Sequence, residues 1–470
     1  HLSIRRQRQM CIRDSFSRVV EIVRETKAKD NQTVVVVSAM SGVTNTLIEG
    51  ARAAAKGQHE HYQRLKADLL RRHLDTVEQL ELEAKIRLDV CGLVEDRLYD
   101  FERLCRSVAT LRELTPRGLD LISSLGERLS VAMLAGALST AGLKAQAMEA
   151  TEIILTDDNF GQATPLMEET RRRVLARLGP ILARGVIPVV TGFMGATAEG
   201  VTTTLGRGGS DYTATILGAC LSADEIQIWT DVDGIMTADP RIVPEAYTLP
   251  EMTYSEAAEL AYYGAKVLHP KTVLPAAELS IPLRIVNTFN HTHPGTMLVR
   301  ESHVTDNAAK AVTVIKDLSL ITVEGRGMLG VPGIAARTFA AVARGDVNVL
   351  MISQSSSEQN ICFIVSEAAA KKVVEALHKE LELEIVRRNI DRIVSLDGVA
   401  IVAVVGAGMR RTPGVAGRIF GALGREGINV LAVAQGSSEC NFSMVVERKD
   451  ADQAVRAVHH DLLMPAAAAR

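Results

Sequence analysis

A glycine-rich turn carries the clearest chemistry in the sequence. The stretch TTLGRGGSDYTATILGA (203–219) leads into a helical pattern that begins near Ser210. The glycines of the turn itself are Gly206, Gly208 and Gly209. Glycine lets backbone N–H groups approach an anion closely, and a helix N-terminus adds a favourable dipole. Arg207 can pair with a carboxylate and Asp211 can position a metal ion or a cation. The turn indicates a phosphate or carboxylate site, although a tight strand–helix connection also favours glycine.

A second polar segment follows the next predicted strand. In EIQIWTDVDGIMTADPR (225–241) a buried strand ends in Thr230 and Asp231 and runs into an Asp-Gly turn. Ligands of open α/β sheets gather at the carboxyl ends of strands. A nucleotide can therefore bind here with Arg241 near its phosphates, while an ordinary loop turn would show the same pattern.

Two further segments offer groups for a small substrate. SAMSGVTNTL (38–47) follows a strand and presents Thr44 for hydrogen bonding. SLGERLS (124–130) places Glu127 at a helix start, where it can meet a substrate ammonium or serve only as a capping charge. Both segments fit a pocket that binds an amino acid.

The segment YYGAKVLHPKT (262–272) supplies one more cation. Lys266 can face a phosphate, and His269, beside a proline, fits a structural role near the turn. The sequence contains no GxxxxGK[ST] motif and no GxGxxG after a strand, and the HRD and DFG motifs of protein kinases are missing. Neither a P-loop nor a dinucleotide-binding fold is supported.

The elements that must position these residues follow an α/β pattern. Short apolar, β-branched runs alternate with helical patterns, and strands that are apolar on both faces suit a parallel sheet covered by helices. These runs occupy residues 33–40, 185–194, 225–232 and 281–289. The charged, leucine-rich stretch from Gly57 to Pro116 predicts two or three long inserted helices, and the polar segment 289–311 predicts a domain boundary.

An internal repeat fills the last third of the chain. Residues 325–365 align with 406–446 at an offset of 81 without a gap, and 19 of the 41 pairs are identical. Chance would give roughly three. Each copy predicts a βαββαβ unit whose helix begins just after a Pro-Gly pair, with outward N–H groups that can receive an anionic ligand. An ordinary packing domain would show the same elements.

Composition excludes several classes of function. The chain has 470 residues and a formal charge of −3 from 53 basic and 56 acidic residues, which leaves no electrostatic footprint for nucleic acid or an anionic membrane. The six cysteines lack CxxC spacing, which favours a reduced compartment over a disulfide framework or zinc site. We expect no membrane span, because no apolar run in the sequence approaches the roughly 18 residues that one needs. We expect a cytoplasmic protein with small-molecule partners.

Taken together, these segments resemble the aspartate kinases of the amino-acid kinase family over roughly residues 17 to 465, and the repeat resembles their paired ACT domains. The resemblance implies an α/β fold, an amino-acid-kinase-like parallel-sheet sandwich with a helical insertion, followed by two βαββαβ ACT domains. The implied domains are a catalytic domain over 1–300 and ACT domains over 312–390 and 395–465. The implied reaction is ATP-dependent phosphorylation of L-aspartate to 4-phospho-L-aspartate, the first step toward lysine, threonine and methionine.

The resemblance also implies roles for individual residues. Arg207 would bind the substrate α-carboxylate, Glu127 its α-ammonium, and Thr44 and Ser210 would complete the pocket, with Asp211 at the phosphoryl-transfer centre. The nucleotide side would comprise Gly208, Gly209, Thr230, Asp231, Met236, Arg241 and Lys266. Met236 stands where the family often has an aromatic residue beside the adenine. Cofactors would be ATP and Mg²⁺ bound through its phosphates, because phosphoryl transfer requires mainly alignment and charge neutralisation.

The repeats resemble modules that bind an end-product amino acid. Candidate effector-binding residues are Asn348, Gln354, Asn429 and Gln435, and the loops QSSSE (354–358) and QGSSE (435–439) look most like the threonine-responsive type. We therefore expect feedback inhibition by threonine rather than lysine, and a homo-oligomer formed through the ACT domains. Relatives of this type often continue into a homoserine dehydrogenase domain, so we expect either a monofunctional version or a shortened chain.

The opening stretch departs from the family pattern. Where the family has a first strand and a Lys-Phe-Gly-Gly-Thr-Ser turn, this chain has HLSIRRQRQMCIRDSF (1–16), with no lysine before Lys27 and no glycine. Arginine and glutamine also suit a buried parallel strand poorly. We expect that residues 1–15 are not the native start and that the polypeptide as written has little kinase activity.

Two alternatives remain open from the sequence alone. One is a kinase for another carboxylate, such as glutamate or N-acetylglutamate, against which the tandem repeat and GRGGSD argue. The other is a non-catalytic regulator that binds an amino acid, favoured only by the altered N-terminus.

Overall fold

The computed structural model describes residues 12–29, 32–264, 268–302, 308–329, 331–354, 359–435 and 440–464. Its described residues divide into two compact units. The first unit contains residues within 12–235, 250–258 and 268–302, and the second contains those within 236–249, 259–264 and 308–464. The second unit therefore includes two short segments that interrupt the first unit in sequence.

The first unit is built on short buried strands at the positions that the sequence predicts. Strands β1 (Val35–Val37), β3 (Ile187–Thr191) and β2 (Ala145–Met148) form a parallel sheet in that order. A second sheet has the order β6-β8-β9-β7, in which β6 (Ile226–Thr230) and β8 (Leu283–Asn287) are parallel. The other strands of the first unit are β4 (Met194–Ala196), β5 (Thr202–Thr204), β7 (Glu251–Thr253) and β9 (Thr296–Val299).

The strands of the first unit are not parallel throughout. β9 runs antiparallel to β8, and β4 and β5 form a separate antiparallel hairpin. The eight residues 288–295 connect β8 to β9, and antiparallel strands can be joined by a short loop, whereas parallel strands need a crossover of a dozen residues or more.

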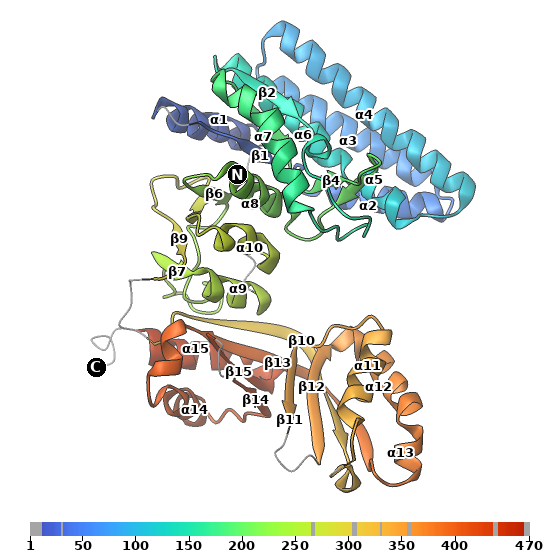
Figure 1. Cartoon of the computed structure of the whole chain (residues 1–470), viewed down its shortest axis with the longest axis vertical. Coiled ribbons are helices and arrows are strands. Elements are labelled where there is room, and N and C mark those ends of the chain that lie inside the picture. The colour runs from blue at the N-terminus through green and yellow to red at the C-terminus, as the bar shows by residue number, and fades with distance from the viewer. Residues whose placement is uncertain are drawn as a thin grey trace. The chain divides into compact units, whose positions relative to one another are not determined.

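Helices surround these sheets and form the predicted insertion. Their bounds are α1 Ile12–Ala28, α2 Val43–Ala55, α3 His59–Gln79, α4 Ala84–Leu111, α5 Pro116–Ser123, α6 Leu125–Thr140, α7 Met167–Ala183, α8 Gly209–Leu221, α9 Tyr254–Tyr262 and α10 Pro270–Glu278, with the 3₁₀ helix η1 at Ala150–Glu152. The long helices α3 and α4 pack side by side (Figure 1). Large side chains such as Leu47, Leu98 and Leu129 join α2, α4 and α6 in one core that also includes strand residues. The insertion is thus part of the core of the first unit.

One helical stretch meets the length and composition of a membrane span. Pro116–Thr140 covers α5 and α6, and 89% of its 18-residue apolar window is buried inside the protein. The expectation that no apolar run is long enough for a membrane span is therefore wrong for this stretch. Burial of its side chains is the behaviour of a core helix.

The second unit repeats one motif twice. Helix α11 (Ile334–Arg344) and strand β12 (Asn360–Ser366) recur 81 residues later as α14 (Val415–Arg425) and β15 (Asn441–Glu447), as the sequence repeat predicts. The remaining elements are β10 Ala311–Glu324, η2 Arg326–Met328, β11 Met351–Gln354, α12 Glu367–Glu380, α13 Glu382–Val386, β13 Arg392–Val405, η3 Ala407–Arg411, β14 Ala432–Ala434, η4 Arg448–Asp450 and α15 Ala451–Leu463.

The two copies share one six-stranded sheet. Its order is β11-β12-β10-β13-β15-β14, and the long central strands β10 and β13 pair with each other (Figure 1). Along β12, Ile361, Phe363 and Val365 pack with α11 and α12 in one core, while Ile364 lies in another core on the opposite face. This alternation follows from the two-residue period of a strand.

Candidate active site

The glycine turn lies between β5 and α8 and is enclosed by other segments. Gly208 is the N-cap of α8 and has φ 73°, a conformation that L side chains rarely adopt. A Cβ atom placed on Gly208 would lie 2.7 Å from Cβ of His269. His269 itself caps α10, because its Nδ1 accepts a hydrogen bond from the backbone N–H of Lys271. The structural role that the sequence predicts for His269 agrees with this geometry.

The start of α8 lies against the ends of β1 and β3. A Cβ atom on Gly192 would be 2.5 Å from Cβ of Ser210, so only glycine fits there. The N–H of Gly192 donates to the carbonyl of Val37 at the end of β1 (2.8 Å). Ser210 and Asp211 are both buried in the first turn of α8, and Arg207 is exposed before it. Three of the predicted site residues are thus brought to the carboxyl ends of two parallel strands, where ligands of α/β sheets bind.

Glu127 reaches the segment that follows β1. Its side chain is 3% exposed on α6, and its Oε1 accepts the backbone N–H of Ala39 at 3.2 Å. Among the described residues no hydrogen-bond partner lies at Oε2. Burial raises the pKa of Glu127 to about 8. A buried carboxylate with one oxygen unmatched is suited to receive a cationic group.

Thr44 lies where α6 packs closely against the start of α2. A Cβ atom on Gly126 would lie 2.7 Å from Cβ of Ala39 and 3.4 Å from Cγ1 of Val43, which shows how closely α6 approaches the start of α2. Thr44 is half-buried in the first turn of α2. The structure therefore brings Thr44 and Glu127 to one region of the first unit, and their shared role in substrate binding stays a prediction.

Phe193 lies against the start of α8 and was not among the residues that the sequence singled out. It has φ 70° between β3 and β4, a conformation that is strained for a residue other than glycine. Its N–H donates to Oγ1 of Thr213 (3.1 Å), and its ring would be 2.7 Å from a Cβ on Gly209. Strained residues cluster at ligand sites. The bulky residue within the glycine-flanked TGFMG (191–195) was the available signal.

The nucleotide candidates of the first unit lie at the end of β6. The hydroxyl of Thr230 donates to Oδ1 of Asp231 at 3.2 Å, and Asp231 is exposed. The sequence analysis did not foresee the role of Asp233, whose Oδ1 accepts the side-chain amides of Asn287 (2.8 Å) and Asn290 (3.0 Å). These bonds tie the loop after β6 to the end of β8.

The other nucleotide candidates are not placed in the first unit. Met236 and Arg241 belong to the second unit, where Thr237 donates its N–H to Tyr247 in a hairpin. The Arg241 side chain is 74% exposed and pairs with Asp239. Lys266 lies outside the described residues.

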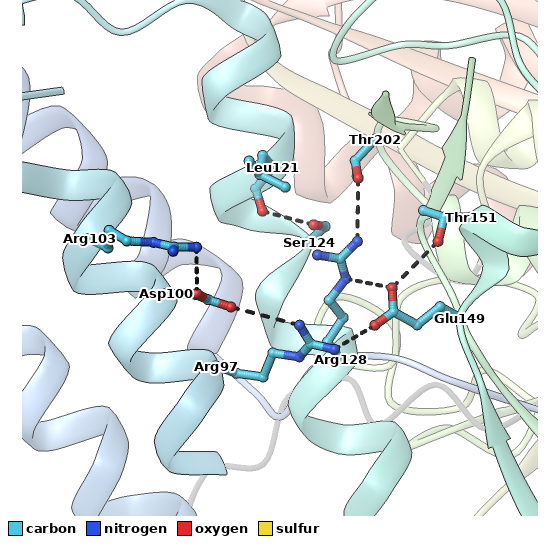
Figure 2. A network of polar contacts seen from close by, with 9 residues as sticks. All are labelled: Arg97, Asp100, Arg103, Leu121, Ser124, Arg128, Glu149, Thr151 and Thr202. Atoms are coloured by element: carbon cyan, nitrogen blue, oxygen red, sulfur yellow. Dashed lines mark hydrogen bonds and ion pairs between the residues drawn. The ribbon is translucent and has the colours of Figure 1, made fainter. Parts of the chain in front are cut away.

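A polar network holds the helix that carries Glu127 (Figure 2). Nε of Arg128 lies 3.0 Å from Oε2 of Glu149, and its guanidinium donates to Oγ1 of Thr202 in β5. Arg97 on α4 donates to the same Glu149 carboxylate at 2.9 Å and lies 3.8 Å from Asp100. The network joins α4, α6 and β5 beside the site.

The effector candidates all lie in exposed positions of the second unit. Gln354 ends β11 and Gln435 follows β14, and the hydroxyl of Ser353 donates to the carbonyl of Val433 (3.1 Å), which brings these two strands together. Asn348 and Asn429 precede the same strands. Residues 355–358 and 436–439 of the two predicted loops lie outside the described residues.

Known proteins share this organisation. The sequence profile of the Amino acid kinase family matches residues 4–287, and the ACT domain profile matches 321–381 and 402–462. Aspartokinase 1 (chloroplastic) of Arabidopsis thaliana is 33% identical over 434 residues, which is 91% of this chain and 74% of the relative. The chain belongs to the aspartokinases of the amino acid kinase family. Its predicted family and fold class are therefore confirmed.

Other relatives differ in length. The bifunctional aspartokinase/homoserine dehydrogenase 1 (chloroplastic) of Arabidopsis thaliana is 36% identical over 92% of this chain but only 48% of the relative, so the chain spans about half of that protein. Crystal structures of E. coli aspartokinase III cover 98% of the chain, with TM-score 0.81 and 29% identity for the complex with aspartate and ADP, and 0.74 and 28% for the complex with lysine and aspartate. Because the plant relatives are chloroplastic, the cytoplasmic location stays a prediction.

Proposed function

We propose that the chain transfers the γ-phosphoryl group of ATP to the side-chain carboxylate of L-aspartate, giving 4-phospho-L-aspartate. The observation that carries this proposal is the buried carboxylate of Glu127, whose Oε2 has no hydrogen-bond partner among the described residues. It suits the α-ammonium of an amino acid, as an uncompensated buried carboxylate requires a cation. Family membership and the likeness to an aspartokinase that binds aspartate and ADP support the same substrates.

The residues of the first unit divide the work of binding. Glu127 and Arg207 would hold the α-ammonium and α-carboxylate, and Thr44, Ser210 and Phe193 would line the space between them. The glycine turn and the first turn of α8 would supply backbone N–H groups and a favourable dipole for the transferred charge. Catalysis then arises from alignment and charge stabilisation and needs no protein nucleophile.

Magnesium would be held mainly by the nucleotide. Among the described residues, no group of three His, Cys, Asp or Glu side chains gathers in a way that suits a metal ion. The single carboxylate of Asp211 fits an ion whose remaining ligands are phosphate oxygens and water. When bound with ATP, the ion would neutralise charge on the phosphates. Thr230, Asp231, Gly208 and Gly209, together with Met236, Arg241 and Lys266, remain the proposed nucleotide-binding set.

The second unit would provide feedback control by an end-product amino acid. Gln354 and Gln435, with Asn348 and Asn429, are the proposed effector contacts, and neutral side chains favour threonine over lysine. The relative that binds lysine supports an amino-acid effector of some kind. Association of identical chains through these domains is part of the same proposal.

The test is formation of acyl phosphate from L-aspartate with ATP and Mg²⁺, trapped as the hydroxamate. The chain is compared with a version in which residues 1–9 are replaced so that Lys-Phe-Gly-Gly-Thr-Ser is in register. We expect strong activity only in the second protein. Effector binding without product from either protein would favour the non-catalytic regulator, and activity with glutamate or N-acetylglutamate alone would favour another carboxylate kinase.

A further inference from the structure

The buried carboxylate of Asp120 lies at the junction of three segments around the glycine turn. Asp120 is 2% exposed on α5. Its Oδ2 accepts two backbone N–H groups, from Gly161 and from Thr204, each at 2.9 Å. Its Oδ1 accepts the hydroxyl of Thr204 at 2.8 Å. One side chain therefore joins α5, the loop before α7 and strand β5.

Both partners of Asp120 support the turn that contains Arg207. Thr204 is the last residue of β5, three residues before Arg207. Gly161 lies against the turn itself, because a Cβ atom on Gly206 would be 3.0 Å from the Gly161 carbonyl oxygen. The carbonyl of Thr204 also accepts the N–H of Ala163 (2.9 Å). The carboxylate thus fixes the strand that leads into the turn and the loop that packs against it.

Asp120 is also fixed relative to Glu127. The two residues lie seven positions apart in the helical stretch Pro116–Thr140, in which Ser124 keeps right-handed helical angles (φ −70°, ψ −14°). In an ideal helix seven residues span almost two turns and rise about 10 Å, which places both residues on one face of the stretch that α5 and α6 form around Ser124. The Arg128–Glu149 network holds the same helix in place beside Glu127 (Figure 2).

We infer that Asp120 is a positioning residue that sets the separation between Glu127 and Arg207, and with it the specificity for the α-ammonium and α-carboxylate of one amino acid. The inference rests on the proposed function, which assigns these two groups to the ends of the substrate. Asp120 itself does not contact the substrate. It acts through three hydrogen bonds, and small displacements of a binding group cost large factors in affinity or rate.

Binding of L-aspartate and of Mg-ATP is measured by calorimetry, so that the result does not depend on turnover. The decisive variants are Asp120→Asn and Asp120→Ala. Asparagine can accept both N–H groups through its carbonyl oxygen and donate to the Thr204 hydroxyl, which then acts as acceptor. We expect Asp120→Asn to bind L-aspartate within about threefold of wild type and Asp120→Ala to bind at least about tenfold more weakly. Mg-ATP affinity should fall less than L-aspartate affinity in both variants, because the turn that Asp120 supports contains Gly208 and Gly209 but not Thr230 and Asp231, the other proposed nucleotide contacts of the first unit.

Two further variants separate positioning from stability. Thr204→Val removes only the hydroxyl bond and should weaken L-aspartate binding about threefold. The matched control Glu384→Ala removes a carboxylate that accepts Arg337 (2.8 Å) and Asn389 (2.6 Å) in the second unit. It should lower thermal stability without changing L-aspartate affinity.

Each outcome decides between the proposals. Wild-type affinity for L-aspartate in Asp120→Ala would overturn the inference. If Asp120→Ala does not fold, wild-type affinity for L-aspartate in Thr204→Val would do the same. Equal losses of affinity for L-aspartate and Mg-ATP would also overturn it. A loss in Asp120→Asn as large as that in Asp120→Ala would also overturn the inference, because asparagine can keep the three hydrogen bonds. Absence of L-aspartate binding both in the chain as written and in the version that carries Lys-Phe-Gly-Gly-Thr-Ser would instead overturn the proposed function.

Discussion

Binding of L-aspartate should release a proton from Glu127. Burial raises the pKa of this carboxyl to about 8, so about nine-tenths of the unliganded protein carries it protonated at pH 7. An ammonium group at Oε2 favours the ionised form and lowers the pKa. If binding requires the ionised carboxylate, about 0.9 proton leaves per ligand at pH 7, and L-aspartate affinity rises about fivefold between pH 7 and pH 8.

Calorimetric titrations in buffers of different ionisation enthalpy measure the number of protons released. The control variants are Glu127→Gln, which cannot ionise and should abolish the release, and Glu152→Gln, an exposed site in the same unit that should leave it unchanged. A wild-type enthalpy that does not depend on the buffer at pH 7 would refute the reasoning, and so would equal release from Glu127→Gln.

The same shift has a consequence for stability. Because the pKa of Glu127 is higher in the folded than in the unfolded chain, its contribution is fully present below about pH 4.5 and is lost as pH rises through about 8. In a thermal-shift assay, added L-aspartate should therefore raise the unfolding temperature more at pH 8 than at pH 6.

Three other predictions follow from the described contacts. Burial lowers the pKa of His73 to about 4. The stability that its neutral ring provides should therefore be lost as pH falls from about 6.5 toward 4, by up to about 3 kcal/mol in the free energy of unfolding from urea titrations. His73→Asn should flatten this dependence on pH. Gly208→Ala should destabilise the first unit by about 1–3 kcal/mol in the same assay and abolish L-aspartate binding, because φ 73° strains an alanine and its Cβ would collide with His269. L-aspartate binding as tight as in wild type would contradict the assigned geometry. Glu149→Gln should lower the free energy of unfolding by about 2 kcal/mol, because it leaves the Arg128 guanidinium without its counter-charge. A loss of stability that disappears at high salt would contradict this reasoning, because it would indicate a solvent-exposed ion pair.

Local patterns in the sequence were enough to predict the main elements and to name candidate site positions. The β-branched runs predicted β1, β3, β6 and β8, because strands that are buried on both faces need apolar residues throughout. The 81-residue repeat predicted two equivalent copies. Glycines before a helix and polar residues after strands identified the positions around Ser210, Thr44 and Thr230, because the chemistry of an anion site is encoded within a few residues.

Tertiary structure alone decided which of these residues act together. It paired Glu127 with the backbone of Ala39, 88 positions away, and raised the pKa of the carboxyl by removing water from it. It selected Asp120 as the link between a helix and a strand 84 residues later. It also assigned Met236 and Arg241 to the second unit, although both lie between β6 and β7 of the first. Sequence determines conformations through neighbouring residues, whereas burial, strain and long-range hydrogen bonds exist only when the folded chain brings distant segments together.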